Sequence, residues 1–183
     1  GTVSGAFFNA TGGSKYGSYE FDGVDDYVEI AYDNTLNITE AITVSAWANP
    51  KIVQGSGTFI IYSRGNYDTG VTLGLSNALW DFLLVNSTGY DQTFGNPSGG
   101  QSNTFSYVVG TWDSASGNKS LYVNGVLENS EIWNKGGRLR NDATQFFVGR
   151  RVDGQYWNGS TDDVAIWNRS LSADEILIIN NTG

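Results

Sequence analysis

Hydrophobic and polar positions alternate with a period of two along much of the chain, which is the pattern of strands that bury one face. Residues 42–47 show it clearly, because an apolar face alternates with a face that carries Thr43, Ser45 and Trp47. Large residues on both faces favour a central rather than an edge position for this strand. The pattern predicts strands at residues 16–22, 26–31, 41–49, 58–63, 70–75, 79–86, 104–113, 119–124, 126–131, 144–150 and 161–168.

Turn and cap signals separate these strands. Asn124-Gly125 lies between two apolar strands, and both residues tolerate the positive φ of a type I′ hairpin turn. Ser172 and Glu175 form a capping-box pattern before residues 176–179, which predicts a short C-terminal helix packed against the sheets. Residues 87–103 carry no strong pattern and predict a long loop, a common place for a binding surface.

Composition supports a many-stranded protein with tight turns. The chain has 24 glycines and only two prolines. It contains no linker, internal repeat or charge block, so residues 1–183 are expected to form a single domain. It has no run of 18 apolar residues, and membrane insertion is therefore not expected.

The residue types that are missing restrict the chemistry. With no His and no Cys, nucleophile systems built on those residues and His or Cys zinc sites are excluded. Oxygen-rich sites remain, and these favour hard cations such as calcium. The net charge of −9 argues against a nucleic-acid partner. Arg138, Arg140, Arg150 and Arg151 could form one local basic patch or lie scattered in solvent.

Four segments in order carry a resemblance to a known family. They are Phe21-Asp22-Gly23-Val24-Asp25-Asp26-Tyr27-Val28-Glu29-Ile30, residues 43–50, residues 107–113 with 121–126, and residues 159–172. Together they closely resemble laminin G-like domains of the LamG/pentraxin type, in the concanavalin A-like lectin/glucanase superfamily. The resemblance implies an all-β, two-sheet antiparallel jelly roll and a non-catalytic recognition function toward a glycan or a cell-surface protein.

Two other function classes stay open. The first is a structural building block of a glycosylated surface layer or filament. The second is a glycoside hydrolase, because the superfamily includes glucanases with a Glu-x-Asp-x-x-Glu strand. The nearest match is residues 20–25, where Asp25 replaces the last Glu and Gly23 interrupts the strand. We therefore expect no enzymatic activity.

The resemblance also implies a structural calcium ion. Related folds hold it with the carbonyl and carboxylate of an early turn and an Asp of the last long strand. These positions correspond to Asp22, the Gly23 carbonyl and Asp162, with Asp25 or Asp26 as a further ligand. The alternative is that Asp25 and Asp26 only cap a turn while Asp162 faces solvent.

Sugar recognition requires an aromatic platform with polar groups around it. The candidate ligand-binding residues are Arg64, Tyr67, Asp68, Trp80, Tyr90, Trp133, Arg138, Tyr156 and Trp157. Any single aromatic among them could instead serve packing. Trp47, Trp112 and Trp167 lie inside predicted strands and are assigned to the core.

Glycosylation and assembly complete the expectations. Sequons occur at Asn9, Asn37, Asn86, Asn118, Asn158, Asn168 and Asn180. They favour an extracellular or cell-surface location, and Asn86 and Asn118 are expected to be modified most readily. The family's first strand lacks a clear counterpart, so residues 2–8 are expected either to complete the sheet edge within the chain or to reach a neighbour. The second case would give a homo-oligomer or filament.

Overall fold

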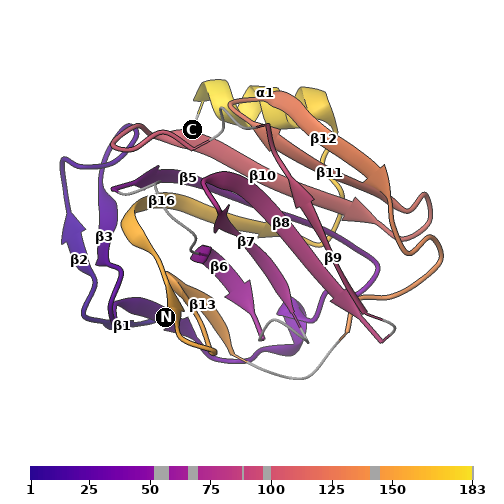
Figure 1. Ribbon diagram of the computed structural model, residues 1–183, viewed down its shortest axis with the longest axis horizontal. Helices are drawn as coiled ribbons and strands as arrows, with labels where there is room; N and C mark the ends of the chain where they lie inside the picture. Colours follow the sequence, from indigo (N-terminus) through magenta and orange to yellow (C-terminus); the bar gives the residue numbers. More distant parts are fainter. Residues whose placement is uncertain (52–57, 66–69, 88, 97–99, 141–144, 183) are drawn as a thin grey trace.

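Two seven-stranded antiparallel sheets face each other in the computed structural model (Figure 1). The structure describes residues 1–51, 58–65, 70–87, 89–96, 100–140 and 145–182. In spatial order, sheet A consists of β1 (Thr2–Ser4), β4 (Tyr27–Ile30), β13 (Phe146–Val148), β6 (Thr58–Arg64), β7 (Val71–Ser76), β8 (Leu79–Asn86) and β9 (Gly89–Phe94). Sheet B consists of β12 (Val126–Ile132), β11 (Asn118–Val123), β10 (Ser106–Asp113), β5 (Ala41–Pro50), β16 (Asn158–Trp167), β3 (Ser18–Asp22) and β2 (Phe7–Asn9). The predicted all-β jelly roll is confirmed.

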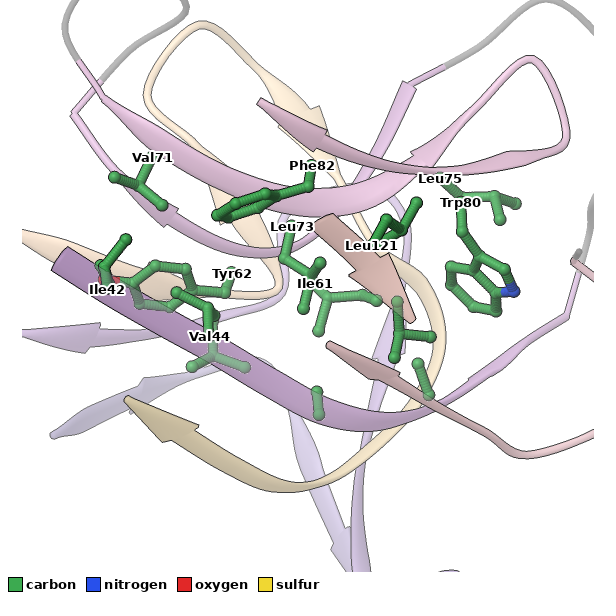
Figure 2. Packing of buried hydrophobic residues seen from close by; sticks show 14 of the residues in the cluster. Ile42, Val44, Ile61, Tyr62, Val71, Leu73, Leu75, Trp80, Phe82 and Leu121 are labelled. Atoms are coloured by element: carbon green, nitrogen blue, oxygen red, sulfur yellow. The ribbon is translucent and has the colours of Figure 1, made fainter. Parts of the chain in front are cut away.

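The core fills the space between the sheets (Figure 2). Val44 on β5 and Phe82 on β8 point into this space from opposite sheets, and both are fully buried. Gly110 on β10 faces Phe82 so closely that an added Cβ would lie 2.3 Å from the ring. Because real Cβ atoms do not approach so closely, only glycine fits below this ring.

The local signals act as their chemistry predicts. Asn124 and Gly125 have φ of 51° and 77°, and they join β11 to β12 in a hairpin. The capping box precedes α1 (Ala173–Thr182): Ser172 N–H donates to the Glu175 carboxylate, and Glu175 N–H donates to the Ser172 hydroxyl. Within the described ranges, no helix is long and apolar enough to cross a bilayer.

The N-terminal residues complete one edge of each sheet. β1 pairs with β4 in sheet A, and β2 pairs with β3 in sheet B, so residues 1–9 connect the two sheets as an N-terminal clip. Gly5 makes the bend between them with a φ of 73°, and its Cα lies against the Asp26 carboxylate. The first of the two alternatives, pairing within the chain, is the arrangement found.

One predicted loop contains regular structure. Within residues 87–103, β9 pairs with β8 from Asn86↔Gly89 to Asp81↔Phe94 and forms the edge of sheet A. β9 has a polar sequence, and its first residues, Gly89 and Tyr90, are exposed. It therefore lacks the apolar alternation by which a strand is predicted. Among the described residues, the short elements outside the two sheets are η1 (Asn34–Leu36), β14 (Arg150–Arg151) and β15 (Gln155–Tyr156).

A β-bulge interrupts β16 and shapes the surface beside it. The register with β5 shifts between Asp162 and Ala165, so that Asp163 and Val164 oppose the single residue Ala46. Asp163 adopts a left-handed φ of 46°, which a short polar side chain tolerates. Helix α1 packs on the outer face of sheet B, and Ile176 is buried there. The bulge thus lies next to a second, smaller hydrophobic cluster under the helix.

Candidate functional site: an acidic turn and an aromatic pocket

The turn between β3 and β4 gathers three carboxylates. Oxygen atoms of Asp22, Asp25 and Asp26 all lie within 4.8 Å of one another. Asp22 Oδ1 accepts the N–H groups of Val24 (2.8 Å) and Asp25 (3.3 Å), and Asp26 Oδ2 accepts Asp22 N–H (2.9 Å). These N–H groups, Val24 first, lower the pKa of Asp22. Burial raises the pKa of Asp26, and the charges of Asp22 and Asp25 raise it further.

This donor set fits a hard cation in part. Three carboxylates at this spacing are ligands that calcium prefers, and a cation there would relieve their mutual repulsion. Asp22 and Asp26 already accept backbone N–H groups, so of the two residues expected to cap the turn in the alternative, Asp25 and Asp26, Asp26 has that role. Gly23 has a φ of 82° and packs against Asn158, so it serves the turn.

Asp162 does not belong to this group, and the predicted ligand set needs correction. β16 pairs Asn158 with Asp22, which leaves Asp162 four residues further along the strand. Its carboxylate accepts the N–H of Ser14 at 3.2 Å, on the loop before β3. Asp26 takes its place in the acidic turn because the turn brings residues 22–26 back on themselves.

An aromatic pocket of about 240 Å³ lies on the outer face of sheet B, between the bulge and helix α1. We call it the outer pocket. It is lined by Ser45 and Trp47 of β5, Tyr107 of β10, Asp163, Val164, Ala165 and Trp167 of β16, and Ile179 of α1. The Trp47 and Tyr107 rings are 5.3 Å apart and inclined at 37°. Three neighbouring strands and the helix therefore converge on one aromatic wall.

Polar atoms in this wall are incompletely paired. Trp47 Nε1 is buried without a hydrogen-bond partner, and the buried Ser45 and Tyr107 hydroxyls lie next to each other and have no other partner. Burial raises the pKa of Tyr107; the adjacent Ser45 hydroxyl lowers it and the Asp163 charge raises it. Buried polar groups without partners are uncommon in native proteins because each costs about 1–3 kcal/mol. A molecule with hydrogen-bonding groups in this pocket could complete these interactions.

Three of the predicted ligand-binding residues have structural roles instead. Trp80 and Trp157 are fully buried, with ring centroids 6.4 Å apart, so neither ring is available to a ligand. Arg64 is also buried and donates to the carbonyls of Ile38 (2.9 Å) and Arg140 (3.1 Å). These assignments are corrected: the three side chains hold the fold together.

The other predicted ligand-binding residues do not form one site. Trp133 packs edge-on against Trp112 at 5.7 Å, and Arg138 forms an ion pair of 2.6 Å with Glu40. Tyr90 is exposed on β9, and Tyr156 is half-buried on β15. The predictions for Tyr67 and Asp68 lie outside the described residues.

Exposure differs among the sequons. Asn118 and Asn168 are exposed, whereas Asn9, Asn37, Asn158 and Asn180 are half-buried. Asn86 is only 5% exposed, and its side-chain oxygen accepts Gly89 N–H. The expectation that Asn86 is modified readily is therefore corrected, since its amide is held inside the β8–β9 connection.

Sequence reasoning overlooked the outer pocket because it assigned Trp47 and Trp167 to the core. Trp112 does lie in the core, but Trp47 and Trp167 are half-buried on the opposite face of sheet B. A signal for this was available. Trp47 alternates with the apolar positions of β5 and shares the face of Thr43 and Ser45, so the period of two already places it outside the main core.

The fold and the pocket define a concanavalin A-like sandwich with a candidate ligand site on its outer face. A family model of laminin G-like domains, described as the concanavalin A-like lectin/glucanases superfamily, matches residues 22–177. The chain therefore belongs to this family. Comparison with curated protein sequences gives no match.

Solved structures share the fold at low sequence identity. The binding domain of botulinum neurotoxin serotype G superposes with a TM-score of 0.78 and 16% identity over 100% of this chain, which spans only 46% of that domain. Domain 4 of the arabinanase AbnA from Geobacillus stearothermophilus, in complex with arabinotriose, gives 0.71 and 15%, covering 98% and 82% of the two chains. A pentraxin from Limulus polyphemus gives 0.64 and 15%, covering 88% and 80%.

Proposed function

We propose that this domain is a non-catalytic recognition domain that binds a glycan in the outer pocket. The observation that carries the proposal is the buried Trp47 Nε1 without a partner, next to the Ser45 and Tyr107 hydroxyls, which have only each other, in an aromatic wall. A sugar has the two kinds of group that would complement this wall: C–H faces that pack on aromatic rings, and hydroxyl groups that complete the hydrogen bonds.

The chemistry of the wall fits a polyol. Trp47 Nε1 can only donate, whereas the hydroxyls of Tyr107 and Ser45 can donate or accept. Asp163 adds an exposed acceptor at the rim. The volume of about 240 Å³ is below the roughly 300–1,000 Å³ of typical small-molecule pockets, which suits a single sugar unit or a chain end.

Catalysis has little support. Retaining glycosidases need two carboxyl groups about 5–5.5 Å apart on one substrate. Among the described residues that line the outer pocket, Asp163 is the only carboxylate. Glu20, the first residue of the glucanase-like segment, is bonded to Asn9 (2.7 Å) and lies 3.7 Å from Lys51. We infer that the domain binds its glycan without cleaving it.

An extracellular or cell-surface setting goes with this function. It is supported by family membership and by the two exposed sequons, Asn118 and Asn168. The AbnA domain, which is similar in fold, was solved with arabinotriose bound, and a comparable oligosaccharide or a glycosylated surface protein is the partner proposed here.

We also propose that the acidic turn binds calcium as a structural ion. The support is the 4.8 Å grouping of the Asp22, Asp25 and Asp26 carboxylates and the like-charge contribution to the pKa of Asp26. When bound, calcium would neutralise this charge where the N-terminal clip bends at Gly5, and so fix the clip against the turn.

The glycan proposal is tested by conservative variants on a glycan array, followed by calorimetry with the glycan that binds best. Trp47→Phe and Tyr107→Phe remove one polar atom each and keep an aromatic ring. Each should weaken binding by about three- to tenfold, the value of one hydrogen bond. Tyr90→Phe, on the opposite sheet, is the matched control and should bind as the parent does.

Two outcomes contradict the proposal. The first is unchanged affinity in both outer-pocket variants while the domain still binds a glycan, which would place the sugar elsewhere. The second is a folded parent domain that binds no glycan on the array, which would favour the structural building block. Circular dichroism of each variant ensures that a loss of binding is not a loss of fold.

A further inference from the structure

A second pocket lies between the two sheets beside the N-terminal clip. It has a volume of about 290 Å³, and we call it the edge pocket. Its apolar walls come from both sheets and are formed by Phe8, Tyr19, Phe21, Val28, Val148 and Val164. Engineered apolar cavities of about 150 Å³ bind benzene, so this space is large enough for an aromatic ring with a short chain.

Two buried hydroxyl groups, those of Ser18 and Thr161, also line this pocket. Thr161 pairs with Ala48 on β5. Because the Ala48 side chain belongs to the core, the Thr161 side chain also faces between the sheets. The residue is 3% exposed, and its hydroxyl has no hydrogen-bond partner. The Ser18 hydroxyl also has no partner, so a ligand inside the edge pocket would find two unused hydroxyl groups there.

Two adjacent carboxylates, Asp162 and Asp163, also line this pocket. Asp162 accepts the N–H groups of Ser14 (3.2 Å) and Asp163 (2.9 Å), and its pKa is raised by burial and by the Asp163 charge. No Lys or Arg among the described residues forms an ion pair with either carboxylate. The two residues are consecutive at the β-bulge of β16, and the charge of Asp163 acts on Asp162.

We propose that the edge pocket binds a small organic amine whose ammonium group meets Asp162 and Asp163 and whose aromatic or branched alkyl body fills the apolar space. The ammonium would supply the missing cation, and the ring of Phe8, Tyr19 or Phe21 can add a cation–π contribution. An anion would be repelled, and a neutral apolar molecule would leave the carboxylate pair uncompensated. This site goes beyond the proposed glycan function, although Asp163 lines both pockets.

The test is a titration followed by NMR, using three probes with nearly the same body and different charge. Phenethylammonium should bind at least fivefold more tightly than phenethyl alcohol, and 3-phenylpropionate should bind weakest. The methyl signals of Val28, Val148 and Val164 should shift on binding. Equal affinity of the amine and the alcohol would overturn the proposal, because the carboxylates would then take no part.

Variants locate the site. Asp162→Asn keeps the shape of the side chain and should weaken phenethylammonium at least threefold while leaving phenethyl alcohol unchanged. Val148→Phe fills the pocket and should abolish binding of both. If a circular dichroism spectrum shows that Val148→Phe does not fold, Asp162→Asn decides alone. Unchanged amine affinity in Asp162→Asn would contradict the proposal, and neither variant should alter glycan binding.

Discussion

Asp81 provides a sharp test of the electrostatics of this fold, because its carboxylate is buried on β8. It is 1% exposed, its Oδ2 accepts Gln92 Nε2–H, and its Oδ1 has no partner. Burial raises the pKa of Asp81 to about 6, although Gln92 and the charges of Arg151 and Lys119 lower it. The perturbation is Asp81→Asn, which keeps the shape and removes the charge.

The sign and size follow from proton linkage. A group whose pKa is higher in the folded state than its ordinary 3.8 favours folding when protonated, and this contribution is lost as the pH rises from about 4 to about 6. A shift from 3.8 to about 6, at about 1.4 kcal/mol per unit, is about 3 kcal/mol. Asp81→Asn should therefore be more stable than the parent at pH 7 by up to about 3 kcal/mol and about equal at pH 3.

The assay is urea denaturation of both proteins between pH 3 and pH 7.5, compared at each pH. Taking the difference cancels the other titrating groups that the two proteins share. Asp113→Asn is the control of opposite sign, because Ser116 hydrogen bonds lower the pKa of Asp113 and its removal should destabilise at pH 7. A variant of Asp81 that is less stable at pH 7, or whose advantage does not change with pH, would refute the reasoning.

Two further predictions concern the N-terminal region. Calcium should raise the melting temperature and a chelator should lower it. Asp25→Asn should reduce the difference between the two conditions, whereas the control Asp153→Asn should not. Identical melting curves in calcium and in chelator would contradict a calcium site. Deleting residues 1–8 should leave a monomer that melts several degrees lower, because both sheets lose an edge strand. Size-exclusion chromatography and calorimetry measure the two effects. A truncated monomer as stable as the parent would contradict this prediction.

The fold was largely predictable because its signals are local. The Asn124-Gly125 turn, the capping box at Ser172 and the alternation in β5 depend on neighbours in sequence, and all three are found. β9 was missed because an edge strand needs no apolar face of its own. Missing β9 also meant missing an ion pair. Asp91 on β9 pairs with the fully buried ammonium of Lys119 at 2.9 Å across the sandwich.

The site was less predictable because it depends on which residues the register brings together. Asp22 and Asp162 each follow the family pattern, yet the pairing of β3 with β16 keeps them apart. Trp80 and Trp47 both lie within strands. Trp80 faces the core and Trp47 lines the outer pocket, so the two roles differ only in the face of the sheet on which the residue lies. The bulge at Asp163 adds one residue to β16, and no local signal announces it.

The central claim is that the glycan binds in the outer pocket, and the indole N–H signals test it most directly. The chain has six tryptophans, so a ¹H–¹⁵N spectrum resolves each indole once single variants assign it. Titration with the glycan selected on the array should shift the Trp47 and Trp167 signals strongly and leave those of the buried Trp80, Trp112 and Trp157 in place. Saturable binding with the Trp47 and Trp167 signals unmoved would contradict the account.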